Sequence, residues 1–505
     1  MFPLTHIVER AATLHTARAA VVQGDLQLSY GDVTKRAAHL AGAMIARGIR
    51  PGDRVAILSR NNFRYLEVNL ACAWAGIILI PLNHRLAAKE IDGILARTET
   101  RLLFQALPFD PKGVSAVTWE DDDPPGAPNG YEAMLAPAMP PARAYDAKLD
   151  DIAQIYFTSG TTGEPKGACL THRNLTATAF DTVVSLELTG DDVWLHAPPM
   201  FHLVDAVATW GVTLVGGLHV TEHFDPKTFA ATVRKNRVTQ TALPPTLLDM
   251  VLRQGIDRED FRSLNRLSFG GAPMPEPLYR KLSTAFGCPL TQSYGASEVS
   301  GGVCQQLPRD LLRNGGKFTN SVGQPLPHIQ VRVIDDNGAS VPPGEVGEIV
   351  VSGPRVMAGY WRNEAATKTA IPDGWYRTGD LGRCDVDGHY TVAGRKKDMI
   401  ITGGENVYPM EVENALLEHA AVAEAAVFGI PSERWGEEVC AVVVLNPDMA
   451  VTDDALLVHC RGLIGGYKVP KRIAIAAEPL PKSGPGKIAK TLVRESYLAN
   501  HLEKA

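Results

Sequence analysis

A loop rich in glycine and hydroxyl side chains constrains the fold of this chain more than any other stretch. The apolar residues Ile155, Tyr156 and Phe157 are typical of a short buried strand, and the sequence TSGTTGEPKG follows them directly at residues 158–167. Glycines let backbone amides close around a polyanion, and the hydroxyls and Lys166 add hydrogen-bond donors and positive charge. The loop therefore suits a triphosphate, although composition alone leaves a flexible surface turn open. It is not a Walker loop, because its lysine is not followed by Ser or Thr.

The segments before this loop alternate between helical and strand-like patterns. A helical pattern over residues 30–47 is followed by VAILS at 55–59, a second helical stretch, and the apolar GIILIPLN at 76–83. This alternation predicts an α/β fold with a largely parallel sheet. Residues 106–149 are rich in Pro, Asp, Gly and Ala without clear periodicity, and they are predicted to form a loop or surface excursion.

The pattern changes toward the C-terminus. Short strand-like runs separated by DDNG, PPGE and DVDG turns predict an antiparallel β subdomain over residues 320–395. Beyond it, apolar segments such as VENALLEHAAV and EVCAVVVL predict a small separate domain. The expected fold class is thus α/β: a large N-terminal domain of parallel-rich α/β subdomains plus a small β subdomain, followed by a small α+β C-terminal domain.

The composition excludes several functional classes. With 505 residues the chain is too long for one ordinary core, and a formal charge of −6 without a long basic run predicts no nucleic-acid partner. The seven cysteines never stand in CxxC spacing, so neither a disulfide framework nor a zinc site is indicated. The most apolar stretch, residues 70–82, is shorter than the roughly 20 residues of a spanning helix, so no transmembrane segment is expected. The N-terminus lacks a signal-peptide pattern, which predicts a cytoplasmic location.

The sequence at residues 158–167 resembles the signature of the adenylate-forming superfamily, which includes acyl-CoA synthetases, firefly luciferase and the adenylation domains of peptide synthetases. Segments similar to its other motifs follow in the family order across nearly the whole chain. They are PPMFH at 198–202, GGAPMP at 270–275, SYGASE at 293–298, WYRTGD at 375–380, RKKDMIITGGENVYP at 395–409 and PKSGPGKIAK at 481–490. The resemblance implies an ATP-dependent acid–thiol ligase. Residues 1–396 would form the adenylation domain with the ATP and acyl sites, and residues 397–505 a mobile domain that carries the catalytic lysine.

The resemblance implies ATP and Mg²⁺ as cofactors and coenzyme A as cosubstrate. Tyr294 would lie against adenine, and Asp380 and Arg395 would contact the ribose. Glu298 would be the metal ligand, holding the magnesium ion that bridges the phosphates; a hard cation prefers carboxylate and phosphate oxygens, and an aromatic face offers a flat contact to a purine. The full set of implied ATP- or AMP-binding residues is Thr158, Ser159, Gly160, Thr161, Thr162, Gly163, Lys166, Gly271, Ala272, Pro273, Ser293, Tyr294, Gly295, Ala296, Ser297, Asp380 and Arg395.

The resemblance also implies catalysis by a mobile lysine. Lys487 would bridge phosphate and acyl oxygens while the carboxylate attacks the α-phosphate, and loss of such a contact typically lowers a rate by about 10² to 10³. After pyrophosphate leaves, the C-terminal domain would rotate about the hinge residue Lys397. Gly403 and Gly404 would then line a pantetheine tunnel, where absent side chains permit close approach. A Ser/His/Asp hydrolase is not indicated, because no G-x-S-x-G elbow occurs.

The acyl pocket implied by the resemblance is formed by His202, Val204, Ala208, Gly270 and Gly295, and His202 joins Lys487 and Glu298 among the implied catalytic residues. His202 replaces the aspartate with which amino-acid-activating relatives hold the substrate ammonium group, so an α-amino acid is not expected. The small apolar side chains at 204 and 208 suit an apolar acyl tail. Asp205 would repel a second carboxylate if it faced the pocket, although a helix cap or surface position is equally open. No arginine is assigned to a distal carboxylate, so a diacid is less favoured. A medium- or long-chain fatty acid is expected, with aryl carboxylates close behind.

Several alternatives stay open. Fatty acyl-AMP ligases that load a carrier protein share the first step but usually carry an insertion before the mobile domain, and residues 347–395 are compact, which favours coenzyme A. Luciferase-type oxidation is disfavoured by Ile401, where that family places a lysine. A non-catalytic nucleotide or acyl sensor is disfavoured because the implied signature residues are all retained. A homodimer is suggested only by analogy with the family.

Overall fold

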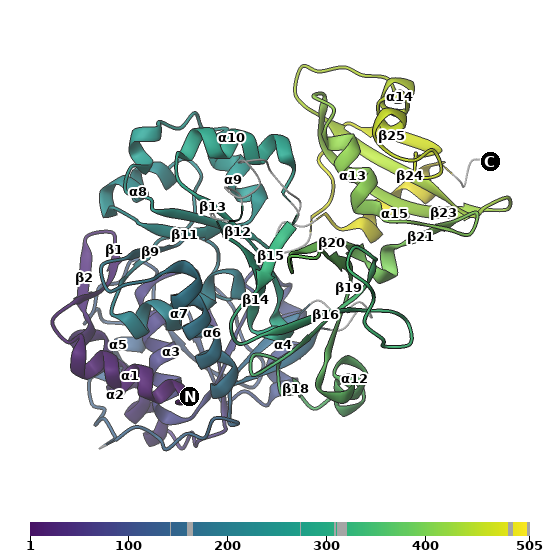
Figure 1. The fold of residues 1–505 in the computed structure, drawn as a ribbon. Helices are drawn as coiled ribbons and strands as arrows, with labels where there is room; N and C mark the ends of the chain where they lie inside the picture. The colour runs from purple at the N-terminus through teal and green to yellow at the C-terminus, as the bar shows by residue number, and fades with distance from the viewer. Residues whose placement is uncertain are drawn as a thin grey trace.

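The computed structural model describes residues 1–141, 143–158, 165–272, 274–307, 310, 321–482 and 488–501. Figure 1 shows a large N-terminal body, coloured purple to green, and a small C-terminal domain in yellow-green at one side of it. The N-terminal body contains two sheets and the C-terminal domain a third. The chain therefore has the expected α/β class, with a large N-terminal and a small C-terminal domain.

The first sheet has seven strands in the order β18-β8-β7-β4-β3-β5-β6. They are β3 (Arg54–Leu58), β4 (Ile78–Pro81), β5 (Leu102–Gln105), β6 (Ser115–Thr118), β7 (Ile152–Thr158), β8 (Lys166–Thr171) and β18 (Gly359–Tyr360). The strands from β7 to β6 run parallel, and β8 and β18 are antiparallel to their neighbours. The runs 55–59 and 76–83, predicted as buried strands, form β3 and β4.

The second sheet has thirteen strands in the order β16-β17-β19-β20-β15-β14-β13-β12-β11-β9-β10-β1-β2. They are β1 (Ala19–Gln23), β2 (Leu26–Ser29), β9 (Val193–His196), β10 (Leu218–Thr221), β11 (Gln240–Leu243), β12 (Arg266–Gly270), β13 (Leu290–Ala296), β14 (Gly301–Gln306), β15 (Ser321–Pro325), β16 (Gln330–Ile334), β17 (Gly347–Ser352), β19 (Tyr376–Cys384) and β20 (Tyr390–Arg395). The run from β1 to β13 is parallel, and every pairing from β14 to β16 is antiparallel. The antiparallel subdomain predicted over residues 320–395 is confirmed as one wing of this larger sheet.

Helices pack against these two sheets. They are α1 (Leu4–Leu14), α2 (Tyr30–Ala46), α3 (Phe63–Ala75), α4 (Ala88–Thr98), α5 (Gly130–Leu135), α6 (His172–Leu186), α7 (Leu203–Val215), α8 (Phe229–Asn236), α9 (Pro245–Leu252), α10 (Glu276–Phe286) and α12 (Glu364–Ala370). Short 3₁₀ turns are η1 (Arg258–Phe261), η2 (Ser297–Val299), η3 (Pro372–Gly374) and η4 (Lys396–Asp398). The largest apolar core joins α1, α2, α3, α6 and α7 to both sheets. Among the helices that the structure describes, none combines the length and apolar character needed to cross a bilayer.

Local sequence explains where the main helices begin and end. Helix α2, predicted over residues 30–47, starts with a capping box in which Ser29 and Asp32 satisfy each other's backbone amides. Helix α7 begins after His202 and ends at Gly216, which adopts the left-handed conformation that glycine tolerates best. The two ends of α7 matter for function because this helix leads from the PPMFH segment along one wall of the site described below.

The C-terminal domain holds a five-stranded sheet with its own apolar core. Its elements are β21 (Ile400–Thr402), β22 (Glu405–Val407), α13 (Pro409–Leu417), β23 (Val422–Ser432), β24 (Gly436–Leu445), α14 (Asp453–Leu463), β25 (Arg472–Ala476) and α15 (Lys490–His501). The predicted division into residues 1–396 and 397–505 falls within η4 and stays a prediction.

The loop predicted over residues 106–149 contains regular structure, so that prediction is wrong in part. Strand β6 pairs in parallel with β5, and α5 starts from Asn129, whose side chain accepts a hydrogen bond from the Glu132 amide. Both elements are short and lie among Pro and Gly residues, so neither leaves a periodic pattern in the sequence.

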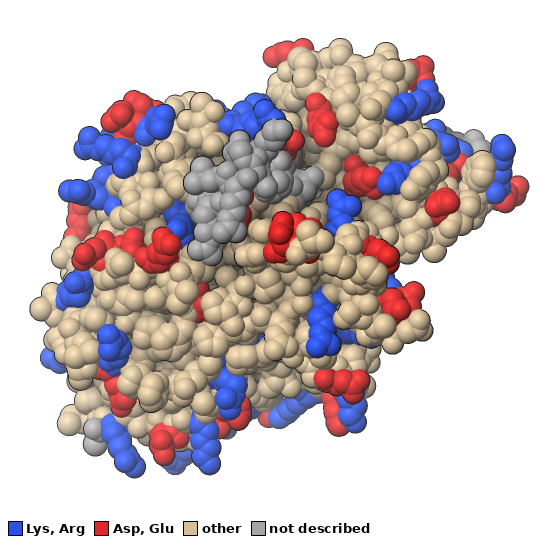
Figure 2. All heavy atoms as spheres, viewed as in Figure 1, with Lys and Arg blue, Asp and Glu red and all other residues tan. Residues whose placement is uncertain are grey.

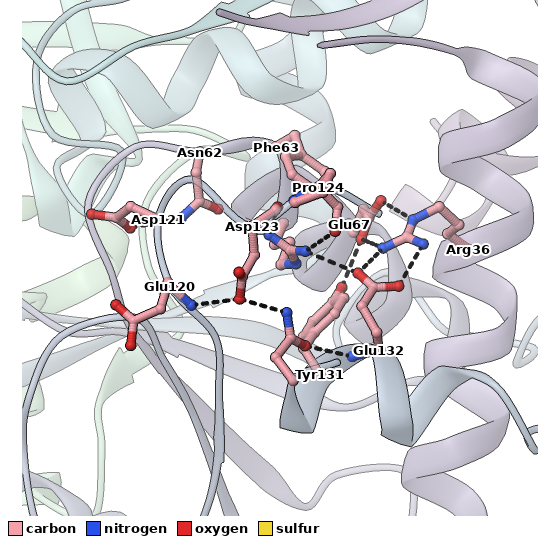
Figure 3. Close-up of polar contacts among 12 residues, drawn as sticks. Arg36, Asn62, Phe63, Glu67, Glu120, Asp121, Asp123, Pro124, Tyr131 and Glu132 are labelled. Carbon is pink, nitrogen blue, oxygen red and sulfur yellow. Dashed lines mark hydrogen bonds and ion pairs between the residues drawn. The ribbon is translucent and has the colours of Figure 1, made fainter. Parts of the chain in front are cut away.

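A buried cluster of ion pairs fastens this segment to the helices beneath it (Figure 3). Arg36 of α2 bonds Glu67 of α3 at 2.6 Å and Glu132 of α5 at 2.8 Å. Arg64 of α3 reaches the same Glu132 at 3.0 Å, and the Tyr131 hydroxyl donates to Glu67 at 2.8 Å. Arg64 and Glu67 are fully buried. The partners come from sequence positions far apart, so tertiary contact rather than local pattern holds the segment in place.

Candidate active site

A cavity of about 1120 Å³ lies where the two N-terminal sheets meet, next to the carboxyl ends of their parallel strands. In open α/β sheets this edge is the usual place for ligands. Many of the residues implied by the sequence line it together: Thr158, Lys166, His202, Val204, Gly270, Gly271, Ser293, Gly295, Ala296, Ser297, Glu298, Arg395 and Lys397. The structure therefore gathers segments almost 240 positions apart, from β7 to η4, around one space.

The other implied residues divide into three groups. Ala272, Tyr294 and Asp380 are neighbours in sequence of lining residues but do not themselves line the cavity. Ala208 packs in the core behind residues that line the cavity, and Gly403 and Gly404 lie in the C-terminal domain. Ser159, Gly160, Thr161, Thr162, Gly163, Pro273 and Lys487 lie outside the described residues.

One pole of the cavity collects oxygen atoms and a lysine. Glu298, on the 3₁₀ turn after β13, accepts a hydrogen bond from the Tyr360 hydroxyl at 3.0 Å and one from Thr158 at 3.4 Å. Lys166 lies over the Tyr360 ring, 5.3 Å from its centroid, within cation–π range. Burial and the Glu298 carboxylate raise the pKa of Tyr360, which keeps its hydroxyl protonated as a donor. This pole offers a cation and an anchored carboxylate side by side.

The donors at this pole fit a magnesium ion held mainly by phosphate. Magnesium at ATP sites is usually bound by one or two carboxylates together with substrate phosphates and water. The hard oxygens of Glu298 and Thr158 match that preference. In the part of the chain that the structure describes, no group of three or more His, Cys, Asp or Glu converges as a self-sufficient metal cage. The protein would thus supply a small share of the ligands and ATP the rest.

A second polar cluster is built around Asp380 on β19 and reaches the cavity through Thr378 and Arg395. Its Oδ2 accepts a hydrogen bond from the Tyr294 hydroxyl at 2.6 Å, and its Oδ1 pairs with Arg395 Nε at 2.8 Å. The Asp380 amide donates to Thr378 Oγ1 at 3.0 Å, which fixes the backbone there. Burial raises the pKa of Tyr294 well above its usual value, and the Asp380 charge adds to this rise. Tyr294 and Arg395, two of the residues implied to contact the nucleoside, thus both contact the third, Asp380.

The PPMFH segment forms an aromatic mouth that a remote residue holds in place. Asn61 donates to the carbonyls of His196 and Pro198, both at 2.7 Å, and accepts from the Met200 amide at 2.8 Å. Phe201 packs against His202, with ring centroids 4.3 Å apart. Asn61 did not stand out in the sequence, since nothing local distinguishes it from a surface asparagine.

Beyond this mouth the cavity continues as a chamber between α6, α7 and the second sheet. Val204 and Val207 line it from α7, one helical turn apart. Ala208, expected in the acyl pocket, is instead fully buried in the core and does not line the chamber. Ala208 shares the helix face of Val204 and Val207, but it packs against Leu188, Trp194 and Val212 and so lies behind the chamber wall.

Asp205 does not face the cavity, and it is neither a surface residue nor a free carboxylate. It is fully buried on α7, with Oδ2 2.5 Å from His196 Nδ1, and its Oδ1 accepts from Trp194 Nε1 at 3.2 Å. The repulsion of a second substrate carboxylate considered from the sequence therefore does not arise from an exposed Asp205.

Three arginines that the sequence did not suggest line the cavity, Arg85, Arg355 and Arg377, and Arg355 is the most buried of them. Arg355 pairs with Asp181 at 2.9 Å, and both side chains are 1% exposed. It also donates to Thr178 Oγ1 at 3.0 Å and to the Ser300 carbonyl at 3.1 Å. Its charge is therefore already compensated, which weakens it as a receptor for a distal carboxylate.

The glycines expected near a thiol tunnel lie in the C-terminal domain. Gly403 and Gly404 form the turn between β21 and β22, with φ values of 60° and 83°. The Gly403 amide donates to the Trp435 carbonyl at 2.9 Å, and a Cβ at Gly403 would stand 3.0 Å from the Trp435 ring. The turn thus favours glycine on conformational grounds, and it follows Lys397, the last lining residue in sequence, by six positions.

Comparison with known proteins places these motifs in context. The family model described as "AMP-binding enzyme" matches residues 8–361, and the model for the C-terminal domain of AMP-binding enzymes matches residues 411–487. A feruloyl-CoA synthase from an Amycolatopsis species is 38% identical, with 97% of this chain and 98% of the relative covered. An indoleacetate–CoA ligase of Aromatoleum aromaticum is 36% identical at the same coverage. The long-chain-fatty-acid–CoA ligase FadD13 of Mycobacterium tuberculosis is 34% identical over 94% of each chain.

Solved structures agree over nearly the full length. ATP-bound MatB from Rhodopseudomonas palustris superposes with a TM-score of 0.89 at 29% identity, covering 98% of this chain and 99% of that one. The o-succinylbenzoate coenzyme A synthetase MenE of Bacillus subtilis, in complex with ATP and a magnesium ion, superposes with a TM-score of 0.86 at 28% identity, covering 97% and 99%.

Proposed function

Because the chain belongs to the family of AMP-binding enzymes and is an ATP-dependent acid–CoA ligase, we propose that its substrate is an aryl-substituted carboxylic acid, activated as an acyl-adenylate. The observation that carries the proposal is the single continuous space in which three parts meet. The Glu298 and Lys166 pole suits phosphates and magnesium, the Asp380 cluster, which reaches the space through Thr378 and Arg395, suits a nucleoside, and the chamber lined by α6 and α7 suits an apolar acid.

The choice of acid rests on the chamber and on the relatives. Two relatives act, by name, on ferulate and indoleacetate, which both carry an aromatic ring. Hydroxyls of Thr182, Ser185 and Ser268 stand among the apolar lining, a mixture that suits a substituted ring better than an unbroken alkyl chain. A medium- or long-chain fatty acid, expected first from the sequence, is the second candidate, supported by the similarity to a long-chain-fatty-acid–CoA ligase.

In the first half-reaction a carboxylate oxygen attacks the α-phosphorus of ATP. The new bond forms the acyl-adenylate as the bond to pyrophosphate breaks. Thr158 and Lys166, which contact Glu298 and Tyr360, would bind the phosphates, and Glu298 would hold magnesium, which would neutralise charge on the leaving pyrophosphate. Lys487, by its sequence position, would bridge the acyl and phosphate oxygens. No protein nucleophile is needed, since both reacting groups belong to the substrates.

In the second half-reaction the sulfur of coenzyme A attacks the acyl carbonyl carbon. The carbon–sulfur bond forms, AMP leaves with the bonding pair, and the thiol proton passes to solvent. Lys487 must vacate the cavity for the thiol to enter, so we assign Lys397 as the hinge of that rotation and the Gly403–Gly404 turn to the thiol channel. His202, at the chamber mouth next to the reacting carboxylate, would orient the acid.

The experiment that tests the proposal measures thioester formation across aryl, fatty, dicarboxylic and amino acids, with ATP, magnesium and coenzyme A. We expect kcat/KM to be highest for acids with one ring and a short chain. A preference for long alkyl acids would replace the aryl assignment with the fatty one. Release of pyrophosphate without thioester formation for any acid would indicate that the acyl group is accepted by a carrier protein and not by coenzyme A.

A further inference from the structure

The chamber stops at a small buried cluster behind the acyl mouth. The cluster consists of Leu186, Leu188, Trp194, Ala208, Val212 and Ala242. Leu186, Trp194 and Ala242 line the cavity, and the other three members do not, so the cluster is the wall at which the open space ends. Trp194 is its largest side chain and is 1% exposed. The indole ring therefore bounds the space available to the far end of an acid.

The indole ring is held by a polar contact as well as by packing. Its Nε1–H donates to Asp205 Oδ1 at 3.2 Å, and the other oxygen of that carboxylate lies 2.5 Å from His196 Nδ1. Trp194 and His196 are two residues apart on β9, so both side chains leave the same face of the strand, toward α7. The Asp205 carboxylate on α7 thus contacts both Trp194 and His196.

The network continues through a second histidine and back into α7. His196 Nε2 lies 2.9 Å from His219 Nδ1 on β10, and the two rings stack with centroids 5.2 Å apart. His219 Nε2 lies 3.1 Å from Thr213 Oγ1, and that hydroxyl donates to the Thr209 carbonyl at 2.6 Å. All of these side chains are buried.

Counting donors and acceptors assigns the protons in this chain. Thr213 has one hydroxyl proton and gives it to the Thr209 carbonyl, so His219 Nε2 must be the donor to Thr213. His219 Nδ1 is then an acceptor, and His196 Nε2 must carry a proton. One further proton lies between His196 Nδ1 and Asp205. His196 and Asp205 together are therefore neutral. Every side-chain nitrogen and oxygen of this network, from Trp194 to Thr213, has a hydrogen-bond partner, which is the condition under which a buried network specifies a unique geometry.

The same helix turn connects this network to the chamber. Val204 and Val207 line the chamber, and Asp205 between them points into the network. Fixing Asp205 therefore fixes both the side wall that the valines form and the end wall that Trp194 forms. A small change in the network should therefore alter binding of the acid. It should not alter binding of ATP, because in the described structure no residue of the network contacts Glu298 or Lys166.

We propose that Trp194 is the specificity-determining residue that sets the longest acid this chain accepts, and that Asp205 is a positioning residue that holds the indole in that role. The proposal rests on the ligase function above and deepens it. It predicts a length limit for any acid, whether its tail is a ring or an alkyl chain.

The first test compares length profiles. Thioester formation is measured for straight-chain acids from butanoate to hexadecanoate and for a matching series of ω-phenyl acids. Trp194→Ala should extend the limit, raising the ratio of kcat/KM for acids beyond it to acids within it by about tenfold or more. Trp194→Phe, which keeps most of the ring, should shift the limit little, and the KM for ATP should stay unchanged in both.

Leu188→Ala is the matched control, since Leu188 belongs to the same cluster without lining the cavity. It should lower stability and leave the profile as it is.

An active Trp194→Ala enzyme with the parent's length limit would overturn the proposal. A parent enzyme that converts hexadecanoate as well as octanoate would overturn it too. If Trp194→Ala does not fold, Trp194→Leu takes its place with the same expectation. A fatty preference combined with a Trp194-dependent limit would reject the aryl assignment and keep this inference, so the two failures are distinguishable.

The second test isolates Asp205 with a double-mutant cycle. Asp205→Asn alone should raise the long-to-short ratio, because the indole is held less firmly. In the Trp194→Phe background there is no N–H to hold, so Asp205→Asn should leave the ratio unchanged while still lowering the unfolding midpoint. Equal effects of Asp205→Asn on the ratio in both backgrounds would show that it acts through general stability and would overturn its positioning role.

Discussion

At the scale of single residues, the phosphate pole depends on contacts between distant segments. Glu298 accepts a hydrogen bond from the hydroxyl of Tyr360 on β18. Strand β18 pairs with β8, which begins at Lys166. Strand pairing therefore places the Tyr360 phenol where its ring meets Lys166 and its hydroxyl meets Glu298. The carboxylate is held in one orientation before any ligand binds, which favours catalysis by pre-positioned charge.

Glu298→Gln tests this arrangement. The substitution keeps size and removes the charge that would hold magnesium, so we expect magnesium-dependent pyrophosphate exchange to fall by about 10² to 10³. Tyr360→Phe, which removes one hydrogen bond to the same carboxylate, should cost about tenfold or less. Exchange by Glu298→Gln at the parent rate and the parent magnesium requirement would rule out the assigned role.

Much of this site could be predicted from the sequence, because its residues stand in long motifs of fixed order. Thr158, Lys166, Glu298, Asp380 and Arg395 all came from such strings, and the structure brings them to one cavity or its border. Tyr360, Asn61 and Trp194 did not, since each acts through a partner more than ten positions away and has no motif of its own. Ala208 was assigned from its family position relative to His202, which does not show that its side chain packs in the core behind the chamber wall.

At the scale of elements, the segment 106–149 shows how packing replaces local pattern. Its prediction as a loop failed because α5 is held by the Arg36–Glu132 and Arg64–Glu132 pairs and β6 by pairing with β5, rather than by periodic apolar residues. By contrast, α2, β3 and β4 were predicted correctly, since a capping box and continuous apolar runs encode them locally.

Glu132→Gln should loosen this segment. It leaves Arg64 without its carboxylate partner and Arg36 with Glu67 alone, in a buried setting, and breaking such a pair typically costs about 3–5 kcal/mol. We expect a lower urea midpoint and faster proteolytic cleavage within residues 106–149. The matched control is Arg234→Gln, which breaks an exposed pair with Asp260 and should cost less than about 1 kcal/mol. Equal midpoints for the two variants would contradict the role given to the cluster.

At the scale of the whole molecule, two buried histidines link stability to pH. Burial lowers the pKa of His172 to about 4, and its Nδ1 accepts the Leu4 amide at 3.2 Å, so the ring is neutral. Burial also lowers the pKa of His219 well below its usual value, and the neighbouring His196 adds to the effect. The unfolded chain takes up these protons near pH 6.5 and the folded chain does not. The free energy of unfolding is therefore highest above pH 6.5. Below that pH it falls by about 1.4 kcal/mol per pH unit for each histidine.

Urea unfolding between pH 7.5 and pH 5 measures this dependence. The midpoint of the parent should be flat above pH 6.5 and decline below it, and His172→Gln should show a shallower decline. The same slope in parent and variant would mean that His172 does not carry its share of the effect.

The two-domain architecture predicts that the half-reactions separate. The C-terminal domain would deliver Lys487 for the first step and turn about Lys397 for the second. Lys487→Ala should therefore lose most adenylation and still convert a supplied acyl-adenylate to thioester. A comparable loss in both steps would contradict this division between the domains.

The central claim is that the acid is activated as an adenylate before it reaches the thiol. A single-turnover reaction with excess enzyme, ATP labelled at the α-phosphate, magnesium and the preferred acid, without coenzyme A, measures this directly. We predict that labelled acyl-AMP accumulates in an amount equal to the pyrophosphate released, and that adding coenzyme A converts it to thioester and labelled AMP. Formation of ADP and orthophosphate, or thioester without any labelled acyl intermediate, would contradict the account.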